Sequence, residues 1–293
     1  MMQPFAESRA VREVFAEASD ALGEDLWTLV TTGPAEALNS TVNTQPVMLA
    51  AGYAVYRAWI DAGGREPTLV AGHSLGEYSA LVAAGVLAFR DAVPLVRFRA
   101  QAMQDAVPVG TGAMAALLGL DDDAVRRLCT EAAQGEVVEA VNFNAPSQVV
   151  IAGHKPAVER AAAAAKAAGA RRAVMLPVSA PFHSSLLVPA ASRLAQYMDG
   201  ITFSRPRIPV VNNVDVAVVD DPQLIKDALA RQACNPVRWV EVIRAIARVG
   251  VTDIAECGPG KVLAGMTKRI DSSLQGYAIT DPASLAQTME TLT

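Results

Sequence analysis

The sequence has few cysteines and aromatic residues, no excess of basic residues and no long apolar run. Its three cysteines, Cys129, Cys234 and Cys257, lie far apart, so they build neither a disulfide framework nor a CxxC metal pair. Lys and Arg total 25 against 30 Asp and Glu, which argues against a general nucleic-acid binder. The most apolar stretch, 80–89, is half of the ~20 residues that cross a bilayer, and the N-terminus has no secretory pattern. We therefore expect a cytoplasmic protein with no nucleic-acid or membrane partner and no metal site.

The composition predicts a globular α/β protein. With 293 residues, 52% of them hydrophobic, the chain can form one large domain or a large domain with an insert. Strand and helix patterns alternate on both sides of residues 110–178, which predicts a parallel sheet covered by helices. Within 110–178 the predicted order is βαββαβ, the ferredoxin-like signature of an inserted subdomain. The predicted strands are 67–71, 113–119, 137–141, 148–152, 172–178, 208–212, 251–256 and 277–280. The predicted helices are 8–22, 45–62, 76–84, 91–106, 121–133, 156–168, 186–198, 222–233, 239–249, 262–270 and one at the C-terminus.

The most informative motif is Gly72-His73-Ser74-Leu75-Gly76, a G-x-S-x-G sequence between a predicted strand and a predicted helix. A sharp turn there would strain the serine, and the glycine on each side would let chain segments pass closely. The hydroxyl would stand at the helix N-terminus, where free N–H groups favour a developing oxyanion. The motif therefore predicts a nucleophile, and an ordinary turn with a serine cap is the alternative.

A nucleophilic serine needs a base, and the sequence contains three histidines. His73 adjoins the serine and should point elsewhere, in a structural or site-lining role. His154, at a helix entry of the insert, is expected to be a solvated turn residue. His183 follows a predicted strand of the resumed α/β pattern, where α/β sites assemble, and is the predicted base. No acid occupies the chain position expected for a triad, so a backbone or amide carbonyl could orient the imidazole.

Arg99 is the candidate for recognising an acidic substrate. It lies 25 positions after Ser74 on a predicted helix and shares a helix face with Met103. A guanidinium can bind a carboxylate through two parallel hydrogen bonds, whereas a basic residue on such a helix is more often simply solvated. The spacing alone leaves both interpretations open.

Longer stretches resemble the malonyl-CoA:acyl carrier protein transacylases of fatty-acid synthesis and the acyltransferase domains of polyketide synthases. They extend from about residue 14 to residue 270 and include GHSLGEYSALVAAGV, RFRAQAMQ, GTGAMAALLGL, VNFNAPSQVVIAG, SAPFHS, PVVNNVD, RQACNPVRW and ECGPGKVLAGMTKRI. The resemblance implies an α/β-hydrolase-like large domain (1–109 and 179–293) interrupted by a ferredoxin-like subdomain (110–178), with the active site between them.

The same resemblance implies transfer of a malonyl group from malonyl-CoA to the phosphopantetheine thiol of acyl carrier protein by a monomer without a bound cofactor. Ser74 would carry the acyl group, and His183 would be the general base, oriented by the backbone carbonyl of Gln232. Arg99 would bind the malonyl carboxylate, and the backbone N–H of Leu75 would donate to the oxyanion. The other implied positions are Gln45, Met103 and Phe182 as lining residues, with Arg171 and Arg172 as candidates for CoA phosphate contacts.

Four of these positions carry further expectations. Phe182 resembles the bulky residue of malonyl-selective members, and Leu75 also resembles that class. A ring beside an α-methyl group would crowd it, but one methyl is worth only ~1–3 kcal/mol, so the preference for malonyl is not expected to be absolute. For Arg171 and its neighbour Arg172, a solvated charge pair is the alternative.

One family feature is not found in the sequence. Family members begin with an apolar strand and a GQGSQ-like turn, whose glutamine N–H gives a second oxyanion donor, and no GQG occurs here. The resemblance thus implies a missing strand and donor, and we hypothesise a late-assigned start codon or a truncated chain. Upstream in-frame codons for an FPGQGSQ-like stretch would support this hypothesis.

Two other functions remain open from the sequence. An α/β-hydrolase esterase or thioesterase would use the same serine turn with water as acceptor. A non-catalytic scaffold would bind a carrier protein or a synthase partner without acylation.

Overall fold

The structure is a computed structural model that describes residues 1–178 and 180–292; Ser179, which opens the SAPFHS stretch, and Thr293 lie outside the described residues. Local sequence sets both ends of the first long helix. The Ser8 hydroxyl caps its start by accepting the N–H of Val11, and Gly23, in a left-handed conformation, ends it. The elements before residue 110 are η1 (Gln3–Phe5), α1 (Arg9–Leu22), α2 (Leu26–Thr32), α3 (Ala35–Asn39), α4 (Thr41–Asp61), β1 (Val70–Ala71), α5 (Gly76–Ala83) and α6 (Phe89–Asp105). The short helices α2 and α3 are not among the predicted elements.

The middle of the chain forms a separate layered body in the order βαββαβ, as predicted. Its elements are β2 (Gly112–Leu118), α7 (Asp122–Ala133), β3 (Val138–Ala145), β4 (Gln148–His154), α8 (Lys155–Ala167) and β5 (Arg172–Met175). The four strands lie in the order β3-β4-β2-β5, and every neighbouring pair is antiparallel. Apolar residues of α7, α8 and one sheet face form a core of their own.

The α/β alternation resumes after residue 180. Its elements are η2 (Ser185–Leu187), α9 (Val188–Asp199), β6 (Val210–Val211), α10 (Pro222–Gln232), α11 (Trp239–Arg248), β7 (Asp253–Cys257), α12 (Val262–Ile270), β8 (Gln275–Ile279) and α13 (Pro282–Leu292). The pairs β1–β6 and β7–β8 are parallel, as predicted, but in the described residues they are two separate ladders rather than one continuous sheet. The first pair is shorter than predicted because Pro67 and Pro209 lack an N–H to donate.

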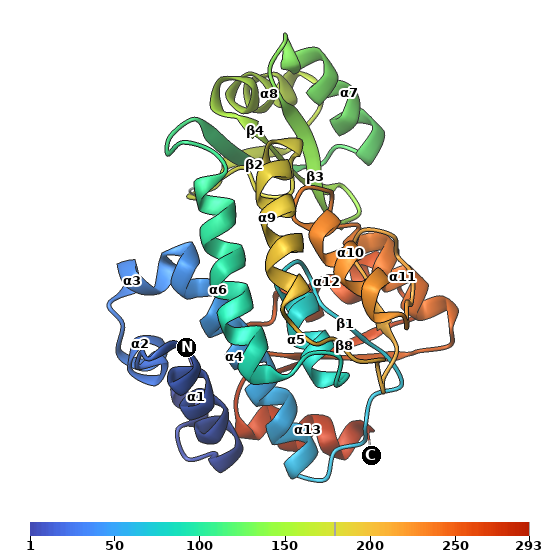
Figure 1. Cartoon of the computed structure of the whole chain (residues 1–293). Coiled ribbons are helices and arrows are strands. Elements are labelled where there is room, and N and C mark those ends of the chain that lie inside the picture. Colours follow the sequence, from blue (N-terminus) through green and yellow to red (C-terminus); the bar gives the residue numbers. More distant parts are fainter. Residues whose placement is uncertain (179, 293) are drawn as a thin grey trace.

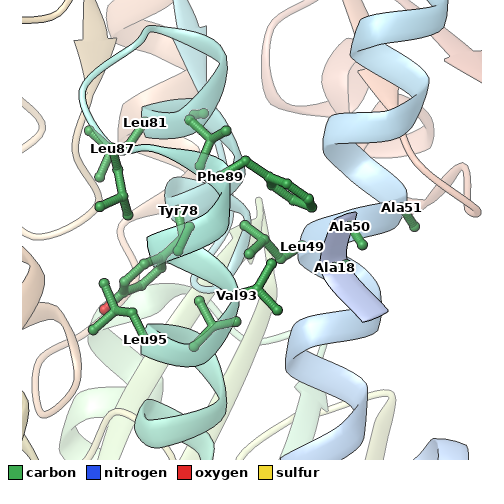
Figure 2. Close-up of a cluster of buried hydrophobic side chains, with 14 of the residues drawn as sticks. Ala18, Leu49, Ala50, Ala51, Tyr78, Leu81, Leu87, Phe89, Val93 and Leu95 are labelled. Atoms are coloured by element: carbon green, nitrogen blue, oxygen red, sulfur yellow. The ribbon is translucent and has the colours of Figure 1, made fainter. Parts of the chain in front are cut away.

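The main core lies among the long helices. Figure 2 shows Leu49 of α4 facing Phe89 and Val93 of α6, with Tyr78 of α5 packed beside them. Leu49, Tyr78 and Val93 have no exposed surface, so each contributes its full burial to stability. This packing fixes α5 and α6, the two helices that follow the serine turn in the chain.

The two bodies meet near the serine turn. Figure 1 shows the antiparallel body at one end of the molecule, with α6 and α9 extending toward it. The strand β3 is joined to the segment before α11, because Phe143 N–H donates to the carbonyl of Val237 and Val237 N–H donates to that of Val141. At the serine turn itself, His73 is hydrogen-bonded to Asn144 of β3 (2.7 Å), so the two bodies are joined there.

Candidate active site

The turn between β1 and α5 presents Ser74. Its φ of 52° lies in the left-handed region, which residues with side chains rarely adopt, so the predicted strain is present. Gly72 makes the turn possible, since a Cβ there would lie 1.9 Å from the backbone carbon and oxygen of Gly76. The expectation that Gly76 is also needed for close approach is wrong, because a Cβ on this first residue of α5 would meet nothing within 4 Å.

Two buried amide side chains hold the backbone of this turn. Asn213, which follows β6, accepts the N–H of Ser74 at its Oδ1 (2.7 Å) and donates from Nδ2 to the carbonyl of Gly72 (2.8 Å). Gln232, the last residue of α10, donates from Nε2 to the carbonyl of Ser74 (3.0 Å). The strained serine is therefore fixed by residues about 140 and 160 positions away in the chain.

The structure brings His183 to the serine. The Oγ of Ser74 and the Nε2 of His183 are 2.7 Å apart, and Nδ1 is 2.8 Å from the backbone oxygen of Gln232. A carbonyl oxygen only accepts, so Nδ1 carries the ring proton and Nε2 accepts from the serine hydroxyl. Burial, followed by the positive charge of Arg99, lowers the pKa of His183 to about 3, which keeps the imidazole neutral near pH 7. His183 also has a positive φ, 65°, a feature that the sequence does not reveal.

Arg99 of α6 lies beside the serine and is almost fully buried, with 2% of its surface exposed. Its Nη1 donates to the Oε1 of Gln45 (2.8 Å), and its Nη2 donates to the Oγ of Ser74 (3.1 Å) and the Oε1 of Gln232 (3.0 Å). The guanidinium stacks over the ring of Tyr78, 5.4 Å from its centroid, and its buried Nε has no hydrogen-bond partner. Within the described part of the chain, Arg99 forms no ion pair with a carboxylate. A buried cation paired only with neutral groups is suited to receiving an anion.

Other predicted lining residues surround this group. Gln45 of α4 and Met103 of α6 are buried, and the Nε2 of Gln45 lies 4.0 Å from the Sδ of Met103. Leu75 directly follows the serine and occupies the N-cap position of α5. Phe182, next to His183, is half-buried and packs against both the main core and the second face of the antiparallel sheet.

The two predicted CoA-binding arginines lie elsewhere. Arg171 and Arg172 are exposed at the start of β5, where Arg172 lies opposite Leu118 at the end of β2. The other end of β2 begins with Gly112, which approaches Pro181 beside the site. The arginines are therefore separated from Ser74 by the length of this strand pair, at about 3.3 Å per residue.

The remaining histidines are not near the serine hydroxyl. His73 turns away from it, as predicted, and its Nε2 donates to the Oδ1 of Asn144 in β3 (2.7 Å). His154 is the last residue of β4, and its Nδ1 accepts the N–H of Val137 (2.9 Å). The predicted helix entry is confirmed, because His154 is the N-cap residue of α8. The prediction of a solvated turn residue is wrong, because His154 ends the strand β4 and is half-buried, with Val137 as a backbone donor to its ring.

The sequence alone does not point to two buried residues of the site, Asn213 and Glu77. Glu77 is in the first turn of α5 and is 2% exposed. Its Oε2 accepts the N–H of Asn213 (2.9 Å) and the Nε2 of Gln232 (2.8 Å). Burial raises the pKa of Glu77 to about 7. An acidic residue in a first helical turn is usually a solvated partner of the helix dipole, so nothing in a single sequence signals this burial.

Together these residues form a serine with a positioned base and a buried cation 3.1 Å from its hydroxyl. Such a group can form an ester with an acyl substrate that carries a negative charge. In residues 1–178 and 180–292, no cluster of His, Cys, Asp or Glu has the arrangement of a metal site. None of the described helices is long and apolar enough to span a bilayer.

Comparison with known proteins identifies the family. The acyl transferase domain family matches residues 2–281. The chain is 57% identical over 280 residues to the malonyl CoA-acyl carrier protein transacylase of Escherichia coli K12, covering 96% of this chain and 91% of that protein. The acyl-carrier-protein S-malonyltransferase of Burkholderia pseudomallei has a similar structure (TM-score 0.97, 64% identity, 99% of this chain and 94% of that one).

A third similar structure is a malonyl-transacylase in complex with a type II polyketide synthase acyl carrier protein. It has a TM-score of 0.98 and 53% identity, over 99% of this chain and 94% of that one. The family matches residues 2–281, a range that includes all the motifs on which the sequence resemblance rests. The chain belongs to the acyl transferase domain family, among the malonyl CoA-acyl carrier protein transacylases.

Proposed function

We propose that this protein transfers the malonyl group of malonyl-CoA to the phosphopantetheine thiol of acyl carrier protein in fatty-acid biosynthesis. The observation that carries the proposal is the buried, carboxylate-free Arg99, whose Nη2 lies 3.1 Å from the Oγ of Ser74, in a member of this family. A thioesterase needs the serine and a base but not a cation for the far end of the acyl group.

In the first half-reaction Ser74 attacks the thioester carbonyl of malonyl-CoA. The hydroxyl proton passes to the Nε2 of His183, 2.7 Å away, while the carbonyl of Gln232 holds the opposite side of the ring. The backbone N–H of Leu75, at the N-terminus of α5, stabilises the oxyanion. The C–S bond then breaks, His183 returns the proton to the CoA sulfur, and a malonyl ester remains on Ser74.

Arg99 selects the acyl group during this step. Its guanidinium binds the free malonyl carboxylate and points the thioester carbonyl toward Ser74. Gln45 and Tyr78 hold the guanidinium in place through a hydrogen bond and ring stacking. Met103 and Phe182 line the acyl site, and the ring of Phe182 disfavours an α-methyl group.

In the second half-reaction the phosphopantetheine thiol of acyl carrier protein takes the place of CoA. The thiol gives its proton to His183 and attacks the ester carbonyl, and the Ser74 oxygen leaves with that proton. The two substrates use the site in turn, so ping-pong kinetics are expected. No step needs a bound cofactor.

The domain arrangement that supports this chemistry is a large α/β-hydrolase-like domain (1–109 and 179–293) interrupted by a ferredoxin-like subdomain (110–178). The separate core of the antiparallel body and its βαββαβ order support the subdomain. The half-buried Phe182 packs against both bodies, which supports an acyl site between them. The protein acts in the cytoplasm as a monomer, and the exposed Arg171 and Arg172 are the candidates for CoA phosphate contacts.

Intact-mass spectrometry after mixing with malonyl-CoA tests the proposal. A transferase gains a persistent adduct of about 86 Da on Ser74, which acyl carrier protein then removes and carries. Ser74→Ala is the matched control and should gain no adduct. A transient adduct with release of free malonate would indicate a hydrolase, and no adduct at all would indicate a scaffold.

A further inference from the structure

We propose that Glu77 is a positioning residue for this reaction, which holds Asn213 and Gln232, the two residues that fix the nucleophile, its base and the substrate-binding cation. The inference rests on the proposed function for the identity of the acyl group, but its effect on the serine can be measured without malonyl-CoA. The backbone N–H of Glu77 donates to the carbonyl of Ser74 (3.1 Å), as the helical turn requires. The hydrogen bonds of its carboxyl group lead instead to Asn213 and Gln232, and it is through these two residues that the side chain acts.

The first branch of the network runs to the strained turn. One oxygen of Glu77, Oε2, accepts the backbone N–H of Asn213 at 2.9 Å. The side chain of Asn213 in turn accepts from the N–H of Ser74 and donates to the carbonyl of Gly72. Glu77 thus fixes the position of the backbone from which both bonds to the turn are made.

The second branch runs through the amide of Gln232. The same Oε2 accepts from the Nε2 of Gln232 at 2.8 Å, and that Nε2 also donates to the carbonyl of Ser74. The amide oxygen accepts from the Nη2 of Arg99, and the backbone oxygen accepts from His183. Gln232 is therefore hydrogen-bonded to the backbone of Ser74 and to the side chains of His183 and Arg99.

Glu77 and the carbonyl of Ser74 together determine which way this amide faces. Its Oε2 accepts from Gln232, so the amide nitrogen must face Glu77 and the amide oxygen must face Arg99. Without an acceptor at position 77, only the carbonyl of Ser74 holds the amide nitrogen, and the amide is freer to turn over and place its N–H groups against the guanidinium. The hydrogen bond that locates Arg99 relative to Ser74 would then be lost.

A purely structural role accounts for Glu77 less well. A carboxyl that serves only the first turn of a helix does so from solvent, whereas Glu77 is 2% exposed. Burying a carboxyl costs free energy unless its hydrogen bonds compensate. Both hydrogen bonds of its Oε2 lead to residues that hold the site.

Two substitutions at Glu77 separate the acceptor from the charge. Glu77→Gln keeps an oxygen that can take the place of Oε2, so both bonds can form without the negative charge. Glu77→Leu removes the acceptor at similar volume. Glu77→Asp, shorter by one methylene, carries the test if the leucine variant does not fold. Glu256→Leu is the matched control, because the half-buried Glu256 of β7 also accepts a backbone N–H, from Ala264 at 2.7 Å, outside the site.

The experiment measures two rates in each folded variant: Ser74 labelling by a fluorophosphonate, and single-turnover acylation over a range of malonyl-CoA concentrations. We expect Glu77→Leu, or Glu77→Asp in its place, to slow both by about 10²-fold, the usual effect of a 1 Å misplacement. The malonyl-CoA concentration for half-maximal rate should change much less. Glu77→Gln should restore both rates to within about threefold of the parent protein, and Glu256→Leu should leave them unchanged.

Three results would overturn the inference: wild-type rates in Glu77→Leu with only a lower melting temperature, equal slowing in Glu77→Gln and Glu77→Leu, or equal slowing in Glu256→Leu. Failure of the proposed function gives a different result. In that case the parent protein is not acylated by malonyl-CoA, while the fluorophosphonate still reports the effect of Glu77 on Ser74.

Discussion

Replacing Arg99 by alanine should change which acyl group the protein accepts. The substitution removes the guanidinium that would pair with the malonyl carboxylate, and it also removes the bond from Nη2 to the Oγ of Ser74. The second loss affects every substrate equally. We therefore predict the ratio of kcat/KM for malonyl-CoA to kcat/KM for acetyl-CoA, in which effects on the nucleophile cancel.

The magnitude follows from the burial of the site. A hydrogen bond to a charged group contributes about 1.5–3 kcal/mol, and two of them, at a guanidinium that is 2% exposed, give about 3–4 kcal/mol after allowing for non-additivity. At 1.4 kcal/mol for each tenfold, the malonyl preference should fall by about 10²–10³-fold in Arg99→Ala. Acetyl transfer should rise relative to malonyl transfer.

The assay is rapid-quench acylation of Ser74 with each thioester, followed by intact mass. Arg97→Ala is the control, because Arg97 lies on the same helix but pairs with Glu24 through two hydrogen bonds at 2.9 and 2.6 Å outside the site. Arg99→Gln, which keeps a donor near Gln232, replaces the alanine variant if that one does not fold. A ratio within threefold of the parent value in the Arg99 variant would refute carboxylate recognition by this residue.

Three further outcomes follow from the structure. Gly72→Ala should abolish fluorophosphonate labelling of Ser74, because its Cβ would overlap the backbone 1.9 Å away, whereas Gly76→Ala should retain it; equal labelling of the two variants would contradict the close approach. Phe182→Ala should raise kcat/KM for methylmalonyl-CoA relative to malonyl-CoA by about 10–200-fold, and no change in competition assays would remove the ring from acyl selection. The pKa of Glu77 is raised to about 7 from an ordinary 4.5, so its protonated form favours the folded state. The resulting stability is fully present below pH 4.5 and is lost as the pH rises through 7. Glu77→Gln should therefore gain about 3 kcal/mol over the parent protein between pH 4.5 and pH 8 in urea unfolding, and a pH-independent difference would contradict the shift.

Much of the fold is predictable because its signals are local. Helix α12 has the predicted bounds, Val262–Ile270, and α1 begins at its serine cap and ends at its glycine. The βαββαβ order of the middle body also follows from local patterns. Strand lengths do not, because a ladder depends on a partner distant in sequence: only Val70 and Ala71 of the predicted strand 67–71 pair with β6.

The site divides in the same way. The turn around Ser74 is visible as a motif, and His183 follows by elimination among three histidines. The hydrogen bond between Arg99 and Ser74 needs the packing of α6 against α5, and spacing alone leaves it undecided. Asn213 and Glu77 are ordinary polar residues in the sequence, and only tertiary structure buries them against the turn.

The position of Arg99 also bears on how malonyl preference could arise. Its positive charge is the second cause, after burial, that lowers the pKa of His183, so this charge makes His183 a weaker base. A carboxylate bound to Arg99 offsets that charge and makes His183 a stronger base, whereas an acetyl group leaves the charge uncompensated. Malonyl-CoA is then preferred over acetyl-CoA in two ways: it binds more tightly, and Ser74 is deprotonated faster when it is bound. In single-turnover acylation, malonyl-CoA should therefore exceed acetyl-CoA in the maximal rate at saturation, and a difference confined to the half-saturating concentration would leave only the binding effect.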